Sequence, residues 1–407
     1  MKVLVSCYAC SPYQGSEPGM GWNFVNSLSR YHELHIITEG KFEADIRRFF
    51  SENPEREKDF HFYFIWKKRH KKLRKIWPPS YYWFYKAWQK KAYKMAVGLN
   101  EKDNFDVIHQ LNMVGYREPG YLWKINKPLV WGPIGGFGQV PWSLIPTMNL
   151  RGIVFYACHN IINNWQMHFM RRVRVAMKKA AALISATADT QSAIKKIYGR
   201  ESIIISEVGL VGDASKSIAR RSKNEKLKIC WSGLHIPRKS LNLLLDALAI
   251  CGSDNIELHV IGEGSETNRW KRMAHKLKLD NVVWHGWVER ADAIKIMHGC
   301  HLFCITSLSD LTSTVILEAL SYGLPVIALD HCGFSSVLTE NCGIKIAITN
   351  KKQVVSDIGK AIMKLESDED LRYKLAQGAQ QRALEYNWED KAKTISKIYE
   401  SVSVQNI

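Results

Sequence analysis

The chain has 407 residues, which is too long for one ordinary domain and suits two. Its hydrophobic fraction of 46%, charged fraction of 24% and net charge of +18 are those of a globular, strongly basic protein. No run of about eighteen uncharged apolar residues occurs, so we expect no transmembrane helix. Met1–Ser6 leads directly into a strand pattern with too short an apolar region for a signal peptide, so we expect a cytoplasmic protein with reduced cysteines. Cys7 and Cys10 have CxxC spacing, but no second pair follows at zinc-site distance, and we interpret them as structural or incidental.

Apolar, strand-like runs alternate with helical patterns along the whole chain, which predicts parallel sheets. In the first half the runs are Val3–Ala9, Leu34–Thr38, Phe60–Trp66, Val107–Leu111, Leu129–Ile134, Ala182–Ala186 and Ile203–Val208. In the second half they are Leu227–Ser232, Ile256–Ile261, Val282–Gly286, Leu302–Ile305, Pro325–Leu329 and Ile344–Ile348. The polar, charged segment 209–226 between them is the best linker. We therefore expect an α/β fold with two Rossmann-like domains, residues 1–210 and 211–387.

A glycine-rich loop follows the first predicted strand and precedes a helical pattern. Its sequence, SPYQGSEPGMGW, contains Gly15, Gly19 and Gly21, and glycine permits close backbone approach to a ligand. The spacing is not GxGxxG, so by itself the loop indicates either a phosphate-binding loop or a plain turn.

Much of the positive charge is concentrated in residues 67–94 and 165–179, where lysines and arginines alternate with aromatic residues. This composition is typical of a protein that binds an anionic membrane surface, because rings lie at headgroup depth and cations meet acidic lipid. It also suits a nucleic-acid-binding surface, or a solvated helix face over an aromatic core. We favour the membrane, and we expect no nucleic acid because no recognised nucleic-acid motif occurs.

The most informative segment is 307–333, SLSDLTSTVILEALSYGLPVIALDHCG, which reads as loop, helix, tight turn and buried strand. Asp310 falls in the loop, and Glu318 falls inside an apolar helix where an acid is costly to bury without a partner. One interpretation is a helix-capping aspartate and a solvated glutamate; the other is a pair of functional carboxylates.

These two acids, separated by seven residues and followed by an EA…GxPV segment, resemble the signature of the nucleotide-sugar-dependent glycosyltransferases of family four. The resemblance implies the GT-B fold, with two Rossmann-like domains facing across a cleft and a last helix, here residues 388–407, returning to the first domain. It implies that Asp310 lies near the donor sugar and that Glu318 binds the ribose hydroxyls. The first acid is usually glutamate, so the role of Asp310 is less secure than that of Glu318.

The resemblance also implies a grip on the donor diphosphate at residues 232–240, SGLHIPRKS. Relatives often have GRxxxxKG there; Gly233 and Lys239 match, but Leu234 occupies the position of the arginine. Arg238 is the adjacent cation and is a candidate substitute. A diphosphate leaving group needs positive charge, so we expect at least Lys239 to act on it.

Further matches complete the expected donor site. Ile261–Gly264 resembles a GxG turn, residues 283–288 resemble a segment near the nucleobase, and the glycine loop matches a loop that contacts donor phosphates. The resulting donor-site candidates are Gly15, Gly19, Gly21, Gly233, Arg238, Gly262, Gly264, Thr312, Ser313 and Thr314, beside Lys239, Asp310 and Glu318.

The first half is expected to bind the acceptor. Its sequence FDVIHQLN resembles a family strand end, which makes His109 a catalytic candidate, beside Lys239, Asp310 and Glu318, and Asn112 an acceptor-binding candidate, although His109 is equally compatible with a buried structural histidine. Glu17 and Glu118 are lower-ranked candidates for the acceptor.

The resemblance implies sugar transfer with retention of configuration and without a metal or other cofactor. We read Asp368–Asp370, nominally DxD, as acids at a helix start rather than metal ligands. The expected protein moves a sugar from a UDP- or GDP-linked donor to a glycan or polyprenyl-linked acceptor, at the inner face of the cell membrane. The alternatives are a nucleotide-sugar-binding protein without transferase activity and a basic nucleic-acid-binding protein.

Overall fold

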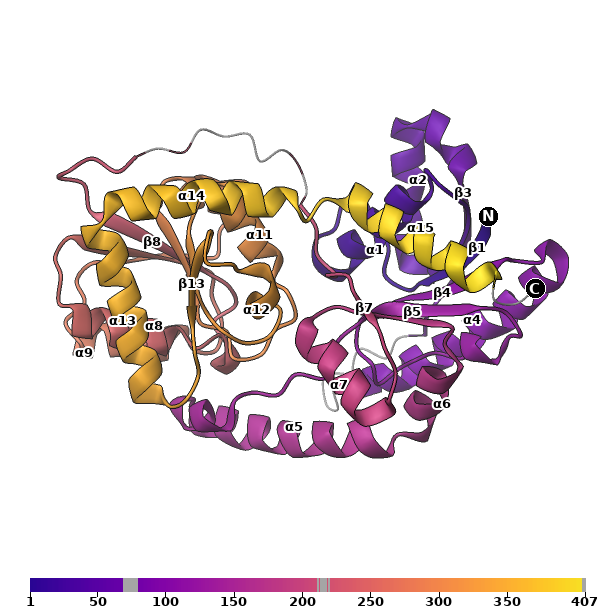
Figure 1. The fold of residues 1–407 in the computed structure, drawn as a ribbon, viewed down its shortest axis with the longest axis horizontal. Helices are drawn as coiled ribbons and strands as arrows, with labels where there is room; N and C mark the ends of the chain where they lie inside the picture. The colour runs from indigo at the N-terminus through magenta and orange to yellow at the C-terminus, as the bar shows by residue number, and fades with distance from the viewer. Residues whose placement is uncertain (69–79, 211, 213–217, 219, 405–407) are drawn as a thin grey trace. The chain divides into compact units, whose positions relative to one another are not determined.

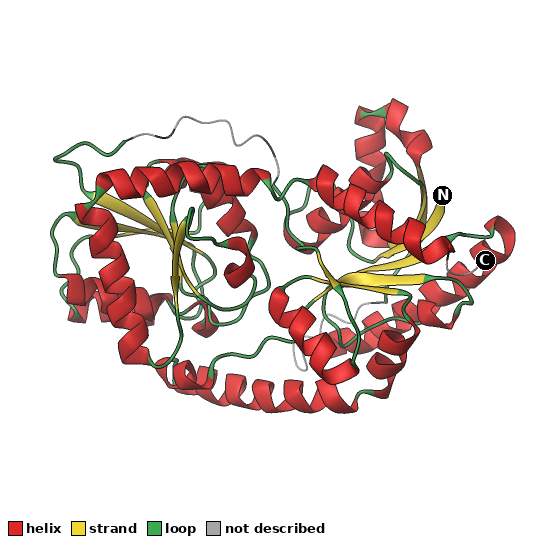
Figure 2. Ribbon diagram, viewed as in Figure 1, coloured by secondary structure: helices red, strands yellow, loops and turns green. Residues whose placement is uncertain are grey.

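The computed structural model describes residues 1–68, 80–210, 212, 218 and 220–404. The chain forms two compact units, and each is a parallel sheet covered by helices (Figures 1 and 2). Unit 1 consists of Met1–Phe137, Gln166–Glu207 and Trp388–Ile407, and unit 2 consists of Gly138–Trp165 and Val208–Asn387. The expected fold class, two Rossmann-like domains with parallel sheets, is confirmed.

Unit 1 contains a seven-stranded sheet in the order β3-β2-β1-β4-β5-β6-β7. Its strands are β1 (Lys2–Cys7), β2 (Glu33–Glu39), β3 (Phe60–Ile65), β4 (Val107–Asn112), β5 (Leu129–Ile134), β6 (Ala182–Ser185) and β7 (Ile203–Ile204). Its helices are α1 (Ser16–Leu28), α2 (Glu43–Glu52), α4 (Ser80–Asp103), α6 (Arg171–Lys179), α7 (Ala188–Tyr198) and α15 (Trp388–Val404). Short 3-10 turns are η1 (Gly40–Phe42), η2 (Pro54–Asp59) and η3 (Leu122–Lys124). Strands β1, β4 and β5 are buried along nearly their whole length, as expected for a parallel sheet covered on both faces.

The last helix, α15, packs against α1 of unit 1. The ring of Trp388 meets that of Phe24 edge-on at 5.0 Å, and Ser396 Oγ lies 2.7 Å from Nε2 of His32. Further along, the hydroxyl of Tyr399 lies 2.6 Å from Nδ1 of His109. These contacts tie the end of the chain to the first unit.

Unit 2 contains a six-stranded sheet in the order β10-β9-β8-β11-β12-β13. Its strands are β8 (Leu227–Ser232), β9 (Ile256–Ile261), β10 (Val282–Gly286), β11 (Leu302–Ile305), β12 (Val326–Leu329) and β13 (Gly343–Ile346). Its helices are α8 (Leu241–Cys251), α9 (Thr267–Lys276), α10 (Arg290–His298), α11 (Thr314–Ser321), α12 (Phe334–Val337), α13 (Lys351–Ser367) and α14 (Glu369–Leu384), with 3-10 turns η4 (Trp142–Thr147) and η5 (Pro237–Lys239). Successive side chains of β8 enter two different core clusters: Ile229 and Trp231 pack with α8 and α13, and Cys230 packs with α11. The sheet is therefore covered on both faces.

The units divide the chain differently from the sequence-based boundaries at one place. Residues 138–165, expected in the first domain, belong to unit 2. Val140, Leu144, Ile145 and Met148 lie in the same core cluster as β8 and α8, because this apolar run packs under the second sheet. Helix α5 (Leu150–Phe169) follows them and ends at the first residues of the next unit 1 segment. Among the described helices, none is both long and apolar enough to cross a membrane.

Candidate functional site

The strand order of unit 2 creates a crevice between the ends of β8 and β11. From β8 the chain proceeds to β9 on one side, and from β11 it proceeds to β12 on the other. Ligands of open parallel sheets bind at such a switch point, at the carboxyl ends of the strands. The two loops are joined there: Leu308 N donates to the carbonyl of Arg238 at 2.7 Å, and Thr306 Oγ1 donates to that of Lys239 at 2.9 Å.

Two cations and one carboxylate meet in this crevice. Lys239 Nζ forms an ion pair with Asp310 Oδ2, and Arg238 Nη1 lies 3.5 Å from Asp310 Oδ1 while donating to the carbonyl of Ser309. The side chain of Lys239 is 11% exposed, and that of Asp310 is 19% exposed. Because the charges number two positive and one negative, the cluster keeps a net positive charge at the place where a switch-point ligand binds.

Arg238 and Lys239 are neighbours in sequence, yet their side chains reach the same carboxylate. The reason is local: they end the 3-10 turn η5, and the next residue, Ser240, has a left-handed backbone with φ 46°. Leu234, at the position where relatives carry arginine, is 52% exposed and contributes no charge. Arg238 therefore brings a second cation to the crevice from a different position of the same loop.

Glycines let the loops after β8 and β9 press together beside this cluster. Gly262 has φ +116°, and a Cβ there would lie 2.1 Å from the carbonyl oxygen of Gly233. A Cβ on Gly264 would lie 2.5 Å from the carbonyl oxygen of His235. Gly233 in turn faces the Lys239 side chain, whose Cε would be 3.8 Å from an added Cβ. The first two glycines are thus required by backbone packing, which shapes the loop that carries Lys239.

The start of α11 follows Asp310 directly. Thr312 is buried and Ser313 is the N-cap residue, with no side-chain hydrogen bond to the helix. The first backbone N–H groups of a helix have no partner within it, and such groups bind phosphate readily. Gly333 packs closely against Thr312, since a Cβ there would lie 2.3 Å from Thr312 Oγ1. Thr312, Ser313 and Thr314 therefore lie at a helix start next to the cation cluster.

Glu318 lies on the partly exposed side of α11, whose other side is buried. Its neighbours Ile316, Leu317, Ala319 and Leu320 are all buried, while its own side chain is 29% exposed. Oε1 forms a 2.8 Å ion pair with Nη2 of Arg290, which begins α10 after the end of β10. No local spacing in the sequence marks Arg290, and only the fold brings it to Glu318.

In unit 1 the expected glycine-rich loop is shorter than predicted, because α1 begins at Ser16, so that Gly15 is its N-cap while Gly19 and Gly21 lie in its first two turns. A Cβ on Gly21 would lie 2.1 Å from the carbonyl oxygen of Ala9, and one on Gly19 would lie 2.5 Å from that of Gln14. Gly15 meets nothing within 4 Å of an added Cβ. Gly19 and Gly21 are thus fixed by packing of α1 on its own loop, and Gly15 alone is open to a ligand.

His109 and the three acceptor-binding candidates do not form one cluster. His109 is fully buried, its ring nitrogens lie 2.6 Å from the Tyr399 hydroxyl and 2.7 Å from the Gly132 carbonyl, and burial lowers its pKa to about 4. Asn112 is buried, and both atoms of its amide are hydrogen-bonded to the backbone of Ala9. The structure places both side chains in the core of unit 1, with structural partners.

The two loop acids are differently placed. Glu17, at the switch point between β1 and β4, accepts a 3.0 Å hydrogen bond from Val114 N, and burial raises its pKa. Glu118 forms a 3.1 Å ion pair with Arg172, and burial raises its pKa too. Glu17 and Asn112 both lie at the carboxyl edge of the sheet, where β1 and β4 end, but the amide of Asn112 is occupied by the backbone of Ala9.

Asp368–Asp370 stands at the start of α14. The Asp368 carboxylate accepts from Leu371 N at 2.9 Å as an N-cap, Glu369 pairs with Arg372, and Asp370 pairs with Arg220. These are the partners of N-terminal helix acids.

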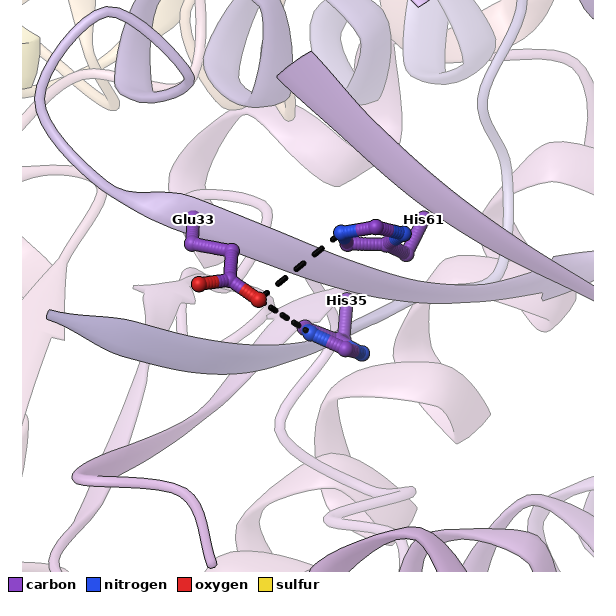
Figure 3. A group of neighbouring side chains, drawn as sticks. All are labelled: Glu33, His35 and His61. Atoms are coloured by element: carbon purple, nitrogen blue, oxygen red, sulfur yellow. Dashed lines mark hydrogen bonds and ion pairs between the residues drawn. The ribbon is translucent and has the colours of Figure 1, made fainter. Parts of the chain in front are cut away.

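A carboxylate and two histidines that sequence analysis did not single out lie together in unit 1: Glu33, His35 and His61 (Figure 3). Adjacent positions in the parallel register of β2 and β3 bring the histidines together, and their ligand atoms and that of Glu33 lie within 4.8 Å. Nε2 of His35 is 3.1 Å from Glu33 Oε1, and Nδ1 is 3.0 Å from the Tyr63 hydroxyl. Hydrogen bonds account for this group, which lies near the amino ends of its strands, away from the ligand-binding edge.

The basic aromatic segment 67–94 divides between core and surface, and its residues 69–79 lie outside the described structure. Lys67 is buried: Nζ donates to the Tyr8 hydroxyl at 3.0 Å and lies 3.5 Å from the centre of the Tyr81 ring. Tyr85 and Trp88 are also buried, whereas the exposed side chains of α4 include Tyr82, Trp83, Lys90, Lys91 and Lys94. In the second segment Arg171, Arg174, Lys178 and Lys179 are exposed. Part of the first segment thus contributes aromatic side chains to the core, while its exposed lysines and rings leave both the membrane-binding and the solvated interpretation open.

Comparison with known proteins agrees with this geometry. Residues 214–382, most of unit 2, match the family model "Glycosyl transferases group 1". The phosphatidyl-myo-inositol mannosyltransferase of Mycobacterium leprae is 25% identical over 41% of this chain and 44% of its own length. The lipopolysaccharide glucosyltransferase WaaG of Escherichia coli is 26% identical over 33% of this chain and 37% of its own length. The matches span less than half of these relatives.

The whole fold is shared with solved structures of low sequence identity. Anabaena HepE, solved in complex with UDP, is 17% identical with a TM-score of 0.62, over 98% of this chain and all of that one. The lipopolysaccharide outer core galactosyltransferase WaaB is 13% identical with a TM-score of 0.65, over the same shares. The second unit thus resembles the group 1 glycosyltransferases in sequence, and both units share the two-domain GT-B fold of these solved structures.

Proposed function

We propose that this chain is a retaining glycosyltransferase that moves a sugar from a UDP- or GDP-linked donor to an acceptor without a metal ion. The observation that carries the proposal is the meeting of Lys239, Arg238 and Asp310 at the switch point of the family-matched unit. A nucleoside diphosphate needs positive charge and free backbone N–H groups, and the cation pair and the start of α11 offer both.

Different residues bind different parts of the donor. Lys239 and Arg238 neutralise the diphosphate as it leaves, so the charge that develops on it meets fixed cations of low exposure. Glu318 offers a carboxylate to the ribose hydroxyls, and Arg290 orients it through their 2.8 Å ion pair. Asp310 holds both cations and lies nearest the sugar.

In the reaction we propose, the bond from the anomeric carbon to the phosphate oxygen breaks while the acceptor oxygen bonds to that carbon from the same face. The acceptor proton passes to the leaving phosphate oxygen, so no protein base is required. The protein supplies positioning and charge stabilisation. This agrees with the burial of His109, which is held by Tyr399 and Gly132.

UDP is the first nucleotide to test, because Anabaena HepE, of similar fold, was solved with UDP and with UDP-glucose. The acceptor we propose is a lipid-linked glycan in cell-surface polysaccharide assembly. The support is that relatives of the second unit include a phosphatidyl-myo-inositol mannosyltransferase and lipopolysaccharide glycosyltransferases. The exposed cations of α4 and α6 would then hold the enzyme on the acidic inner face of the membrane.

The test is transfer from UDP- and GDP-sugars to extracted glycolipid acceptors in the presence of EDTA. We expect a product of retained configuration from one class of donor, and loss of product in the Lys239→Ala variant. Donor binding without transfer over a broad set of acceptors would instead indicate a binding protein without transferase activity.

A further inference from the structure

Two asparagines of helix α5 face the protein interior. Asn160 is fully buried, and its amide accepts from Val140 N at 3.1 Å and donates to the Val140 carbonyl at 2.7 Å. Asn163 is also fully buried. The partly buried Ile153 and Tyr156 pack against the core cluster of unit 2, and Gly152 allows close contact with Pro237. This face attaches the helix firmly to the protein.

The opposite face of α5 is apolar and exposed. Its large hydrophobic side chains are between 53% and 76% exposed, and an exposed cysteine lies among them: Leu150, Val154, Phe155, Cys158, Ile161, Ile162, Trp165 and Phe169. With 3.6 residues per turn, these positions fall in one continuous arc of about 140° along a helix about 30 Å long. Soluble proteins seldom expose a contiguous apolar patch of this kind unless it binds something.

The charged residues in the sequence around α5 are all of one sign. No aspartate or glutamate occurs between Glu118 and Asp189 in the sequence. Arg151 is exposed at one end of α5, and the exposed cations after its other end are Arg171, Arg174, Lys178 and Lys179. An apolar face bordered by cations complements an anionic lipid surface, where apolar side chains enter the acyl boundary and cations remain at the headgroups.

We infer that the exposed face of α5 lies in the interface of an anionic membrane and is the apolar element by which the chain is held there. This inference rests on the proposed function, because a lipid-binding surface on the enzyme would bring it to a lipid-linked acceptor. The apolar arc distinguishes α5 from the cation-rich helices α4 and α6, which supply charge. The helix lies along the surface rather than crossing it.

The test uses the full-length chain with vesicles of equal parts phosphatidylcholine and phosphatidylglycerol, compared with vesicles of phosphatidylcholine alone. We expect sedimentation with the anionic vesicles, and at least tenfold weaker partitioning for the double variant Ile161→Ser with Ile162→Ser. The matched control is Ile250→Ser on α8, which removes an isoleucine that is 65% exposed away from this face and should bind as the unmodified protein does. Raising the salt concentration should weaken vesicle binding by the unmodified protein. It should almost abolish the residual binding of the double variant.

Several results would overturn the inference. One is equal vesicle binding by the double variant and the unmodified protein, and another is no binding of the unmodified protein to anionic vesicles at low salt. A third is a concentration-dependent dimer in sedimentation velocity that the double variant abolishes, because α5 would then be an interface between copies. Thermal stabilisation by UDP and by GDP is measured on the same samples. Stabilisation of the double variant by either nucleotide shows an intact donor site. If neither nucleotide stabilises any sample, the proposed function is rejected and the membrane result still stands.

Discussion

Replacing Lys239 by alanine removes the less exposed of the two cations in the crevice of unit 2. The remaining charges are Arg238, which is 3.5 Å from Asp310, and Asp310 itself. In the unmodified protein Lys239 pairs with Asp310, so the alanine variant also weakens the neutralisation of that carboxylate. A diphosphate entering the variant site therefore loses an attraction and gains a repulsion.

The magnitude follows from charge and exposure. Two unit charges about 4 Å apart interact by about 4 kcal/mol at the effective dielectric constant suited to a site near a protein surface. The Lys239 side chain is only 11% exposed, so solvent screening removes little of this. Allowing about 1 kcal/mol for adjustment by Arg238 leaves about 3 kcal/mol in the transition state, which is at least a hundredfold loss of kcat/KM.

The assay is the initial rate of transfer as a function of donor concentration, for the unmodified protein, Lys239→Ala and Lys239→Arg. Arginine keeps the charge and should restore part of the rate, although its planar group fits the site less well. Urea unfolding of each variant checks that the fold is retained. A rate within threefold of the unmodified protein for a folded Lys239→Ala variant would refute the assignment of this lysine to the diphosphate.

Four further predictions rest on the same structure. Glu318→Ala should lower kcat/KM at least a hundredfold because the ribose loses its carboxylate, and Asp310→Glu should retain activity because relatives usually carry glutamate there; both are checked by the same transfer assay. Gly262→Ala should destabilise unit 2 by several kcal/mol, since the added Cβ would lie 2.1 Å from the Gly233 carbonyl oxygen at φ +116°, and urea unfolding would contradict this if the midpoint were unchanged. Burial lowers the pKa of His109 from 6.5 to about 4, so the unfolded chain accepts a proton below pH 6.5 that the folded protein does not. The free energy of unfolding should therefore fall by about 2 kcal/mol between pH 7 and pH 5 from this group alone. In urea unfolding as a function of pH, His109→Gln should remove this share of the pH dependence.

The parallel sheets could be predicted because their signal is local. Buried strands such as β11 and β12 are continuous apolar runs, and each is followed by a turn and a helical pattern. The signature around Asp310 and Glu318 could also be predicted, because strand, loop and helix follow one another without interruption.

What the sequence did not reveal depends on contacts between distant segments. Residues 138–165 read as a continuation of the first half, and their packing under the second sheet depends on Val140, Leu144 and Ile145 fitting a core formed far along the chain. The pattern of apolar residues indicates that a segment is buried, but it does not indicate which sheet the segment covers. The partner of Glu318 is unpredictable for the same reason, since Arg290 is 28 residues away.

Single side chains were the hardest part to place. Asn112 ends β4, where a functional residue is expected, and His109 lies in the middle of that strand. Their hydrogen bonds to Ala9, and to Tyr399 and Gly132, occupy both side chains within the core. Lys67 was grouped with membrane-binding cations and instead lies buried among tyrosines. In each case the residue type is compatible both with a functional site and with the core. Only the contacts of the side chain in the structure show that it lies in the core.

The measurement that tests the central claim most directly is isothermal titration of UDP, GDP, ADP and dTDP into the unmodified protein, Lys239→Ala and Glu318→Ala, with EDTA present throughout. The account predicts that one of the four nucleotides binds the unmodified protein and that each variant weakens this binding strongly. Binding of none of them, or equal binding by all three proteins, would contradict a metal-independent donor site at the switch point of unit 2.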